Sequence, residues 1–244
     1  IFDEAAGKRH LTERTGMKEK IEIMGISVEK CYAEQVMESI NDHWNSRDSL
    51  STYGILNMGL IMAAQKDGEL KEYIQMLDKA VVDEPEVLKA AGLQDSELEQ
   101  EASGHGFFGT LFWLLDHYRN HIFILGENRE DTEKLCAYLQ EKYPQIVIVG
   151  KDSLPENGED QADRLINEMN AISPQAVLSC SKNYELEKFV KRNRKMVNTS
   201  VWFSLGSCPE ILKETGLGTA WLNRLMEKSN FKKMVSSYKE NEKI

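Results

Sequence analysis

Residues 121–150, HIFILGENREDTEKLCAYLQEKYPQIVIVG, contain the pattern that decides the fold of this chain. An apolar run at 121–125 ends at Gly126, and a second apolar run at 146–149 ends at Gly150. The stretch between them has a helical period, which gathers four residues on one face: Leu135, Ala137, Tyr138 and Leu139. Two short β-branched-rich runs joined by a helix of this length predict a βαβ unit with parallel strands buried on both faces.

The turn after the first run allows two interpretations. Gly126 lies between the end of a strand and the start of a helix, where backbone N–H groups can cradle a phosphate. A single glycine in that place is more often part of a plain turn. The acids Glu130 and Asp131 in the first helical turn also favour helix capping over anion binding.

Strand-like and helix-like stretches alternate on both sides of this unit. Strands are expected at 20–26, 51–56, 80–82, 175–180 and 199–204, with helices from Ala33, from Leu60 and over 160–172 and 184–194. We expect a loop at 151–159, a solvated helix or loop at 93–104, and a flexible arm at 1–18. The alternation predicts one α/β domain over 19–215, with a Rossmann-like, mostly parallel sheet and helices on both faces.

Composition excludes several classes of protein. The formal net charge of −10 argues against a nucleic-acid partner. No apolar run reaches the about 18 residues of a transmembrane helix, and residues 1–16 do not resemble a signal peptide. The four cysteines lack zinc-ligand spacing, so we expect reduced core thiols, no metal and a cytoplasmic protein: Cys31, Cys136, Cys180 and Cys208.

Four stretches carry a resemblance to a known family: KIEIMGI at 20–26, IMAAQKD at 61–67, the central βαβ unit, and AWLNRL at 220–225. In this order they resemble the WecG/TagA/CpsF family of bacterial glycosyltransferases, over roughly residues 20–235. The resemblance implies transfer of N-acetylmannosamine or a related sugar from UDP to a lipid-linked acceptor, in the synthesis of teichoic acid or another surface polysaccharide. It implies neither a cofactor nor a catalytic metal.

The resemblance also points to site residues. Asp83 falls on the family's proposed general base, at a strand end from which a carboxylate can reach an acceptor hydroxyl. Asn57 matches the end of a Thr-x-Asn segment and Glu187 the end of a Gly-x-Pro-Lys-Gln-Glu segment. Together with Ser181 and Gly126 they are expected to hold the nucleotide-sugar. Structural alternatives stay open, because Asp83 or Asn57 can cap a helix and Glu187 can be a solvated helix residue.

Other positions depart from the family's pattern in ways that oppose phosphate binding. Glu84 and Glu86 replace two glycines, Glu101 falls near a family arginine, and Leu186 replaces a polar side chain. Carboxylates beside a pyrophosphate repel it. We therefore expect a transferase with reduced or lost activity. The alternative is a pseudoenzyme, a non-catalytic paralogue that acts as partner or regulator of an active glycosyltransferase.

Three segments outside this motif set have two interpretations each. His105 lies between two glycines, where a histidine without an identified partner is more often structural than a general acid. Residues 216–244 mix lysines with apolar residues, which predicts a basic amphipathic appendage that contacts the inner membrane face or docks on protein. At 107–118, a helix would bury Phe108, Phe112 and Leu115 and leave Trp113 at the edge, as in a homo-oligomer interface, unless the helix is wholly buried.

Overall fold

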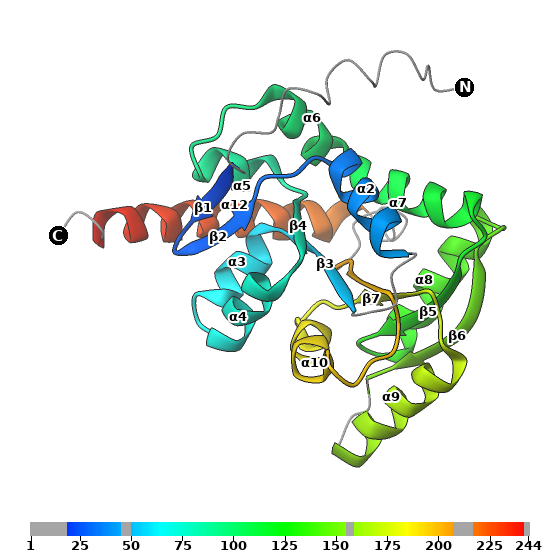
Figure 1. Ribbon diagram of the computed structural model, residues 1–244. Coiled ribbons are helices and arrows are strands. Elements are labelled where there is room, and N and C mark those ends of the chain that lie inside the picture. Colours follow the sequence, from blue (N-terminus) through cyan, green and yellow to red (C-terminus); the bar gives the residue numbers. More distant parts are fainter. Residues whose placement is uncertain (1–18, 45–49, 155–158, 207–216, 242–244) are drawn as a thin grey trace.

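The computed structural model describes residues 19–44, 50–154, 159–206 and 217–241. Its centre is a six-stranded parallel sheet with the strand order β4-β3-β8-β7-β5-β6 (Figure 1). The strands are β3 (Ser51–Leu56), β4 (Lys79–Val82), β5 (His121–Gly126), β6 (Val147–Ser153), β7 (Ala176–Cys180) and β8 (Val201–Ser204). The predicted Rossmann-like α/β fold is confirmed.

Helices cover both faces of the sheet. The first face carries α2 (Ala33–Trp44), α7 (Gly106–His117) and α8 (Arg129–Lys142), and Ile122 and Ile124 of β5 point towards them. The second face carries α3 (Met58–Ala64), α4 (Gly68–Met76), α9 (Glu159–Ile172) and α10 (Glu185–Asn193), and receives Phe123 and Leu125. The short helices α5 (Pro85–Ala90) and α6 (Ser96–Gly104) connect β4 to α7. Burial on both faces explains why β5 is apolar at successive positions.

The unit β5-α8-β6 forms as predicted, with two differences. Strand β6 runs from Val147 to Ser153, so the loop expected from 151 begins later, and residues 155–158 of it lie outside the described residues. β6 is also the edge strand, and its side chains are half buried or exposed, whereas β5 is buried from Ile122 onwards. An edge strand has a neighbour on one side only, so the expectation of burial on both faces was wrong for β6.

Residues 20–26 form the first part of a hairpin, where a single strand was predicted. Strand β1 (Lys20–Ile23) pairs antiparallel with β2 (Ile26–Glu29). The two turn residues, Met24 and Gly25, have φ angles of 47° and 71°, which is the geometry that tight hairpin turns require. Methionine is not one of the usual residues at such a position, so the sequence carries only half of the expected turn signal.

Helix α7 has the stripe that its sequence predicts. Phe108, Phe112 and Leu115 are fully buried, whereas the side chain of Trp113 is 52% exposed. The Trp113 ring stacks on His117 at 4.9 Å between centroids, and His117 meets the exposed Tyr118 edge to face. We call these three residues, Trp113, His117 and Tyr118, the α7 surface. Self-association through it stays a prediction.

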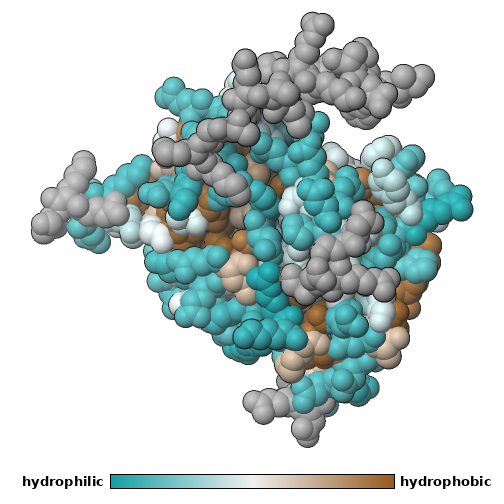
Figure 2. All heavy atoms as spheres, in the orientation of Figure 1, coloured by the Kyte–Doolittle hydropathy of each residue, from teal (hydrophilic) through white to brown (hydrophobic). Residues whose placement is uncertain are grey.

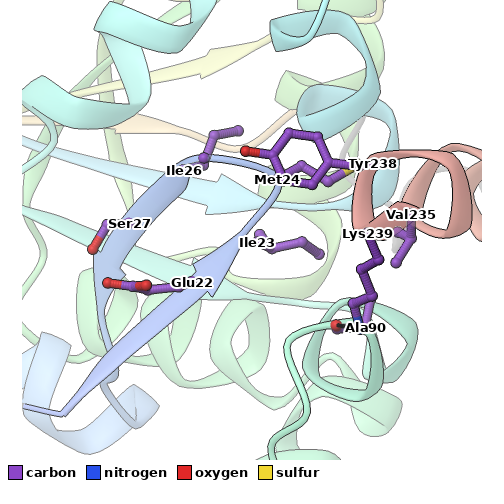
Figure 3. A pocket seen from close by; sticks show the side chains of 10 residues that line it. Glu22, Ile23, Met24, Ile26, Ser27, Ala90, Val235, Tyr238 and Lys239 are labelled. Atoms are coloured by element: carbon purple, nitrogen blue, oxygen red, sulfur yellow. Dashed lines mark hydrogen bonds between the residues drawn. The ribbon is translucent and has the colours of Figure 1, made fainter. Parts of the chain in front are cut away.

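The C-terminal helix α12 (Leu217–Asn241) packs on its own domain beside α3, α5 and the hairpin (Figure 1). Phe231 and Val235 are buried there. Figure 3 shows Tyr238 across the hairpin turn and Lys239 reaching towards Ala90, whose carbonyl accepts a 3.0 Å hydrogen bond from Nζ of Lys239. Residues of the hairpin and of α12 line a pocket of about 420 Å³ at this junction, where Figure 2 also shows hydrophobic residues at the surface.

Two expectations about the ends of the chain are not decided by the fold. The predicted arm, 1–18, lies outside the described residues, and the boundary at 216 stays a prediction. Among the helices that the structure describes, none combines the length and the apolar content needed to cross a bilayer.

Candidate functional site

The predicted site residues gather at the edge of the sheet formed by the carboxyl ends of its strands. Asn57 follows β3, Asp83 follows β4, Ser181 follows β7, and Gly126 is the last residue of β5. Backbone hydrogen bonds link these ends: Asp83 N–H to the Leu56 carbonyl (3.5 Å), Ser181 N–H to Gly206 (2.9 Å), and Glu127 N–H to Cys180 (3.1 Å). Ligands of open α/β sheets bind at this edge. Glu187 does not lie at the end of a strand, because it belongs to the first turn of α10.

Asp83 is paired with His105, and both side chains are buried. Oδ2 of Asp83 lies 2.7 Å from Nδ1 of His105, and the side chains are 5% and 7% exposed. His105 adopts a left-handed backbone conformation, with φ of 52°, at the joint where α6 ends and α7 begins. This joint turns the imidazole back towards the end of β4. His105, which had no identified partner in the sequence, is therefore hydrogen-bonded to the predicted general base.

Asn57 and Glu84 both cap helix α3. Oδ1 of Asn57 accepts a hydrogen bond from Leu60 N–H at 2.8 Å, so the capping alternative is confirmed for this residue. Oε2 of Glu84 accepts one from Met58 N–H at 2.7 Å, and its Oε1 lies 4.0 Å from Arg224. Burial raises the pKa of Glu84 above its usual range. A carboxylate of the chain itself thus lies at the start of α3, beside the predicted nucleotide-sugar site.

The space next to Asn57 is filled by two further side chains. At Gly59, a Cβ atom would overlap the hydroxyl of Tyr184 and come within 2.9 Å of a carboxylate oxygen of Glu227. Only glycine allows this approach. Tyr184 precedes α10 and Glu227 belongs to α12, so two elements converge on the first turn of α3. Burial raises the pKa of Tyr184 and of Glu227.

Glu187 is buried, so the alternative interpretation of it as a solvated helix residue was wrong, and its role in binding the nucleotide-sugar stays a prediction. Its exposed fraction is 2%, and its Oε2 has no hydrogen-bond partner. Burial raises the pKa of Glu187 to about 7, against the opposing effect of a hydrogen bond with Ser181, and the neighbouring carboxylates Glu127 and Glu185 raise it further. Glu187 therefore exchanges a proton near neutral pH, within contact of the predicted site residue Ser181.

Gly126 is required by packing. A Cβ atom there would overlap the hydroxyl of Thr132 and lie 2.6 Å from its backbone nitrogen. The first turn of α8 is closed by Asn128, whose Oδ1 accepts a hydrogen bond from Asp131 N–H at 3.0 Å. Close packing against Thr132 therefore explains the glycine as part of a plain turn. A role for Gly126 in holding a nucleotide stays a prediction.

Two of the acids expected to repel a pyrophosphate have partners of their own. Oε1 of Glu86 lies 2.5 Å from Nζ of Lys228 on α12. Oε2 of Glu101 accepts a 3.0 Å hydrogen bond from Ala33 N–H, where α2 begins. These contacts, like that of Glu84 with the Met58 N–H, reduce the repulsion argued from the sequence. Glu84 is the one of the three acids that contacts the start of α3. The partners are distant in sequence, so no local pattern could have identified them.

The cysteines of the described residues agree with the prediction. Cys31, Cys136 and Cys180 are buried free thiols, and Cys208 lies outside the described residues. Within the part of the chain that the structure covers, no group of three or more His, Cys, Asp or Glu side chains could hold a metal ion.

Sequence reasoning missed Glu127, Tyr184 and Glu227 at this edge. A carboxylate directly after the glycine that ends β5 was a usable signal for Glu127. Tyr184 and Glu227 had none, because their positions depend on how α10 and α12 pack.

Comparison with known proteins places this geometry in a family. No curated protein matches the chain. The sequence model of the glycosyl transferase WecG/TagA/CpsF family matches residues 21–230. These residues include every strand of the parallel sheet, the Asp83–His105 pair and Glu187. The match spans most of the chain, and so the chain belongs to the WecG/TagA/CpsF family of glycosyl transferases.

Proposed function

We propose that this chain is a UDP-sugar glycosyltransferase of its family in which binding and transfer are reduced or lost. The observation that carries the proposal is the filling of the sheet edge beside Asn57 by groups of the chain itself. The Glu84 carboxylate accepts the Met58 N–H, and Tyr184 and Glu227 approach Gly59 closely. A pyrophosphate at this place would meet carboxylates, each of which costs on the order of 1 kcal/mol at a partly exposed site.

The residual reaction would use Asp83 as its base. The carboxylate takes the proton of the acceptor hydroxyl while that oxygen forms a bond to the anomeric carbon of the sugar, and the bond from that carbon to UDP breaks. His105 would orient the carboxylate through the 2.7 Å contact. Replacement of Asp83 by Asn would then lower any measurable transfer by about 100-fold or more.

The substrates follow from family membership. They would be a UDP-sugar, with N-acetylmannosamine or a related sugar, and a lipid-linked acceptor for a surface glycan. An acceptor held in a membrane favours a cytoplasmic protein that is peripheral at the inner membrane face. The exposed Lys232 and Lys233 of α12 support such a contact.

Calorimetric titration of UDP into the chain tests this proposal. We expect no binding at micromolar UDP. Glu84→Gln keeps an acceptor for the Met58 N–H and removes the charge, so its affinity for UDP should exceed that of the wild type by about fivefold. Glu99→Gln is a matched control, because Glu99 lies in α6 and its carboxylate is 3.9 Å from Nζ of Lys89 in α5. Micromolar binding by the wild-type chain, with turnover of a UDP-sugar, would refute the proposal.

The second candidate is a non-catalytic partner or regulator of an active glycosyltransferase. The α7 surface favours it, because Trp113 and Tyr118 are 52% and 61% exposed and large exposed aromatic residues often anchor interfaces. A chain that binds no UDP but lowers or raises the rate of a co-expressed family member would establish this function over the first.

A further inference from the structure

The side chain of Glu127 lies inside a ring of hydrogen-bond donors. Its Oε2 accepts from the Ser181 hydroxyl (2.8 Å), from Lys182 N–H (2.7 Å) and from Asn183 N–H (2.9 Å). Its Oε1 accepts from Nδ2 of Asn183 at 2.6 Å. Four donors from three consecutive residues thus converge on one carboxylate. We call Ser181, Lys182 and Asn183 the β7 nest. Consecutive backbone N–H groups of this kind form anion sites in other proteins.

The hydrogen bonds of the β7 nest favour the ionised form of Glu127. Burial alone would raise its pKa, but the hydrogen bonds from Asn183, Ser181 and Lys182 outweigh burial and hold the pKa below the usual range. Glu187 approaches Ser181 from the buried side. Ser181 has one hydroxyl proton, and the contact with Glu127 uses it. Burial is the cause of the raised pKa of Glu187, and the contact with Ser181 opposes that rise.

The β7 nest is at the point where the sheet's connections diverge. Strands β5 and β7 are neighbours. The chain leaves β5 for α8 on the first face and leaves β7 for α10 on the second face. Open α/β sheets bind their ligands in the crevice that this divergence creates. Here the residue directly after β5 places its own carboxylate against the loop directly after β7.

We infer that Glu127 is an internal anion that occupies a phosphate-type site at this divergence and excludes anionic ligands from it. The chemistry of the β7 nest suits a phosphate or diphosphate oxygen, since the donors face a single negatively charged acceptor. A ligand phosphate can enter only when the Glu127 side chain is removed or displaced. The class of ligand, a nucleoside diphosphate, rests on the proposed function. The inference adds that Glu127 is the residue that excludes this ligand.

The test replaces Glu127 and supplies an anion from solution. Glu127→Ala empties the β7 nest, and Glu127→Gln keeps the shape of the side chain without its charge. Glu130→Ala is the matched control, because Glu130 is an exposed acid of α8 that pairs with Lys134 outside the nest. The probe is inorganic pyrophosphate, compared with chloride at equal ionic strength. The readouts are the melting temperature and the amide resonances of Lys182 and Asn183.

Pyrophosphate should raise the melting temperature of Glu127→Ala by about 3 °C more than that of the wild type or of Glu130→Ala. It should also return the two amide resonances towards their wild-type positions. An equal response of all the variants, or none, would overturn the inference. If Glu127→Ala does not fold, Glu127→Gln decides, because pyrophosphate displaces a neutral side chain from the β7 nest more readily than a carboxylate, and its melting temperature should then rise more than that of the wild type. UDP binding by the wild-type chain refutes the proposed function without affecting this comparison, so the two failures can be told apart.

Discussion

Replacing the buried Glu187 by Gln should make the chain more stable at alkaline pH and remove a pH dependence of its stability. Glu187 has an ordinary pKa of 4.5, and burial raises it to about 7 in the folded protein. The folded state therefore holds a proton that the unfolded state releases between these values. The stability that comes from the protonated side chain is fully present below pH 4.5 and is lost as pH rises through 7.

The size of the effect follows from the same two values. At about 1.4 kcal/mol per pKa unit, the interval from 4.5 to about 7 corresponds to at most about 3.5 kcal/mol of unfolding free energy. About 2 kcal/mol of this is lost between pH 5.5 and pH 8. Gln resembles the protonated carboxyl in shape and carries no charge at any of these pH values, so the variant lacks this loss.

Urea unfolding followed by circular dichroism measures the difference. The range from pH 5.5 to 8 avoids precipitation near the isoelectric point of about 5.1. Titrating groups common to both proteins cancel when the variant is compared with the wild type. Glu168→Gln is the control, because Glu168 is an exposed carboxylate of another helix, α9. If the free energies of wild type and Glu187→Gln stay parallel across this range, the assignment of a proton to buried Glu187 is refuted.

Two further variants test the turn at Gly126 and the α7 surface. Gly126→Ala should lower the free energy of unfolding by about 2 kcal/mol, since the new methyl group overlaps Thr132. In the same urea assay Gly109→Ala, at a helical position with nothing within 4 Å, should raise it by about 0.5 kcal/mol, and equal stabilities would contradict the packing argument. Trp113→Glu should halve the mass seen by light scattering if the α7 surface joins two copies, whereas Asn167→Glu, at an exposed position of α9, should leave the mass unchanged. An unchanged mass of a folded Trp113→Glu chain rejects that interface.

The sequence predicted most of the sheet because local patterns carry the needed information. Buried parallel strands require successive apolar residues, and helices require an apolar stripe, so the unit at 121–150 and the stripe of α7 could be read directly. The hairpin at 20–29 was missed, because Met24 does not signal the left-handed turn that it adopts. The edge position of β6 was also missed, because strand order is not a local property.

The candidate site was predicted in position but not in its contacts. The sequence by itself determined that Asn57, Asp83 and Ser181 follow strand ends, and parallel strands bring such ends to one edge. Only the tertiary structure decided that Asp83 pairs with His105 and that Glu127 enters the β7 nest. Both contacts join residues from different elements. Their formation depends on how helices pack across the sheet, which is set by the sum of many burial contacts and not by any pattern along the chain.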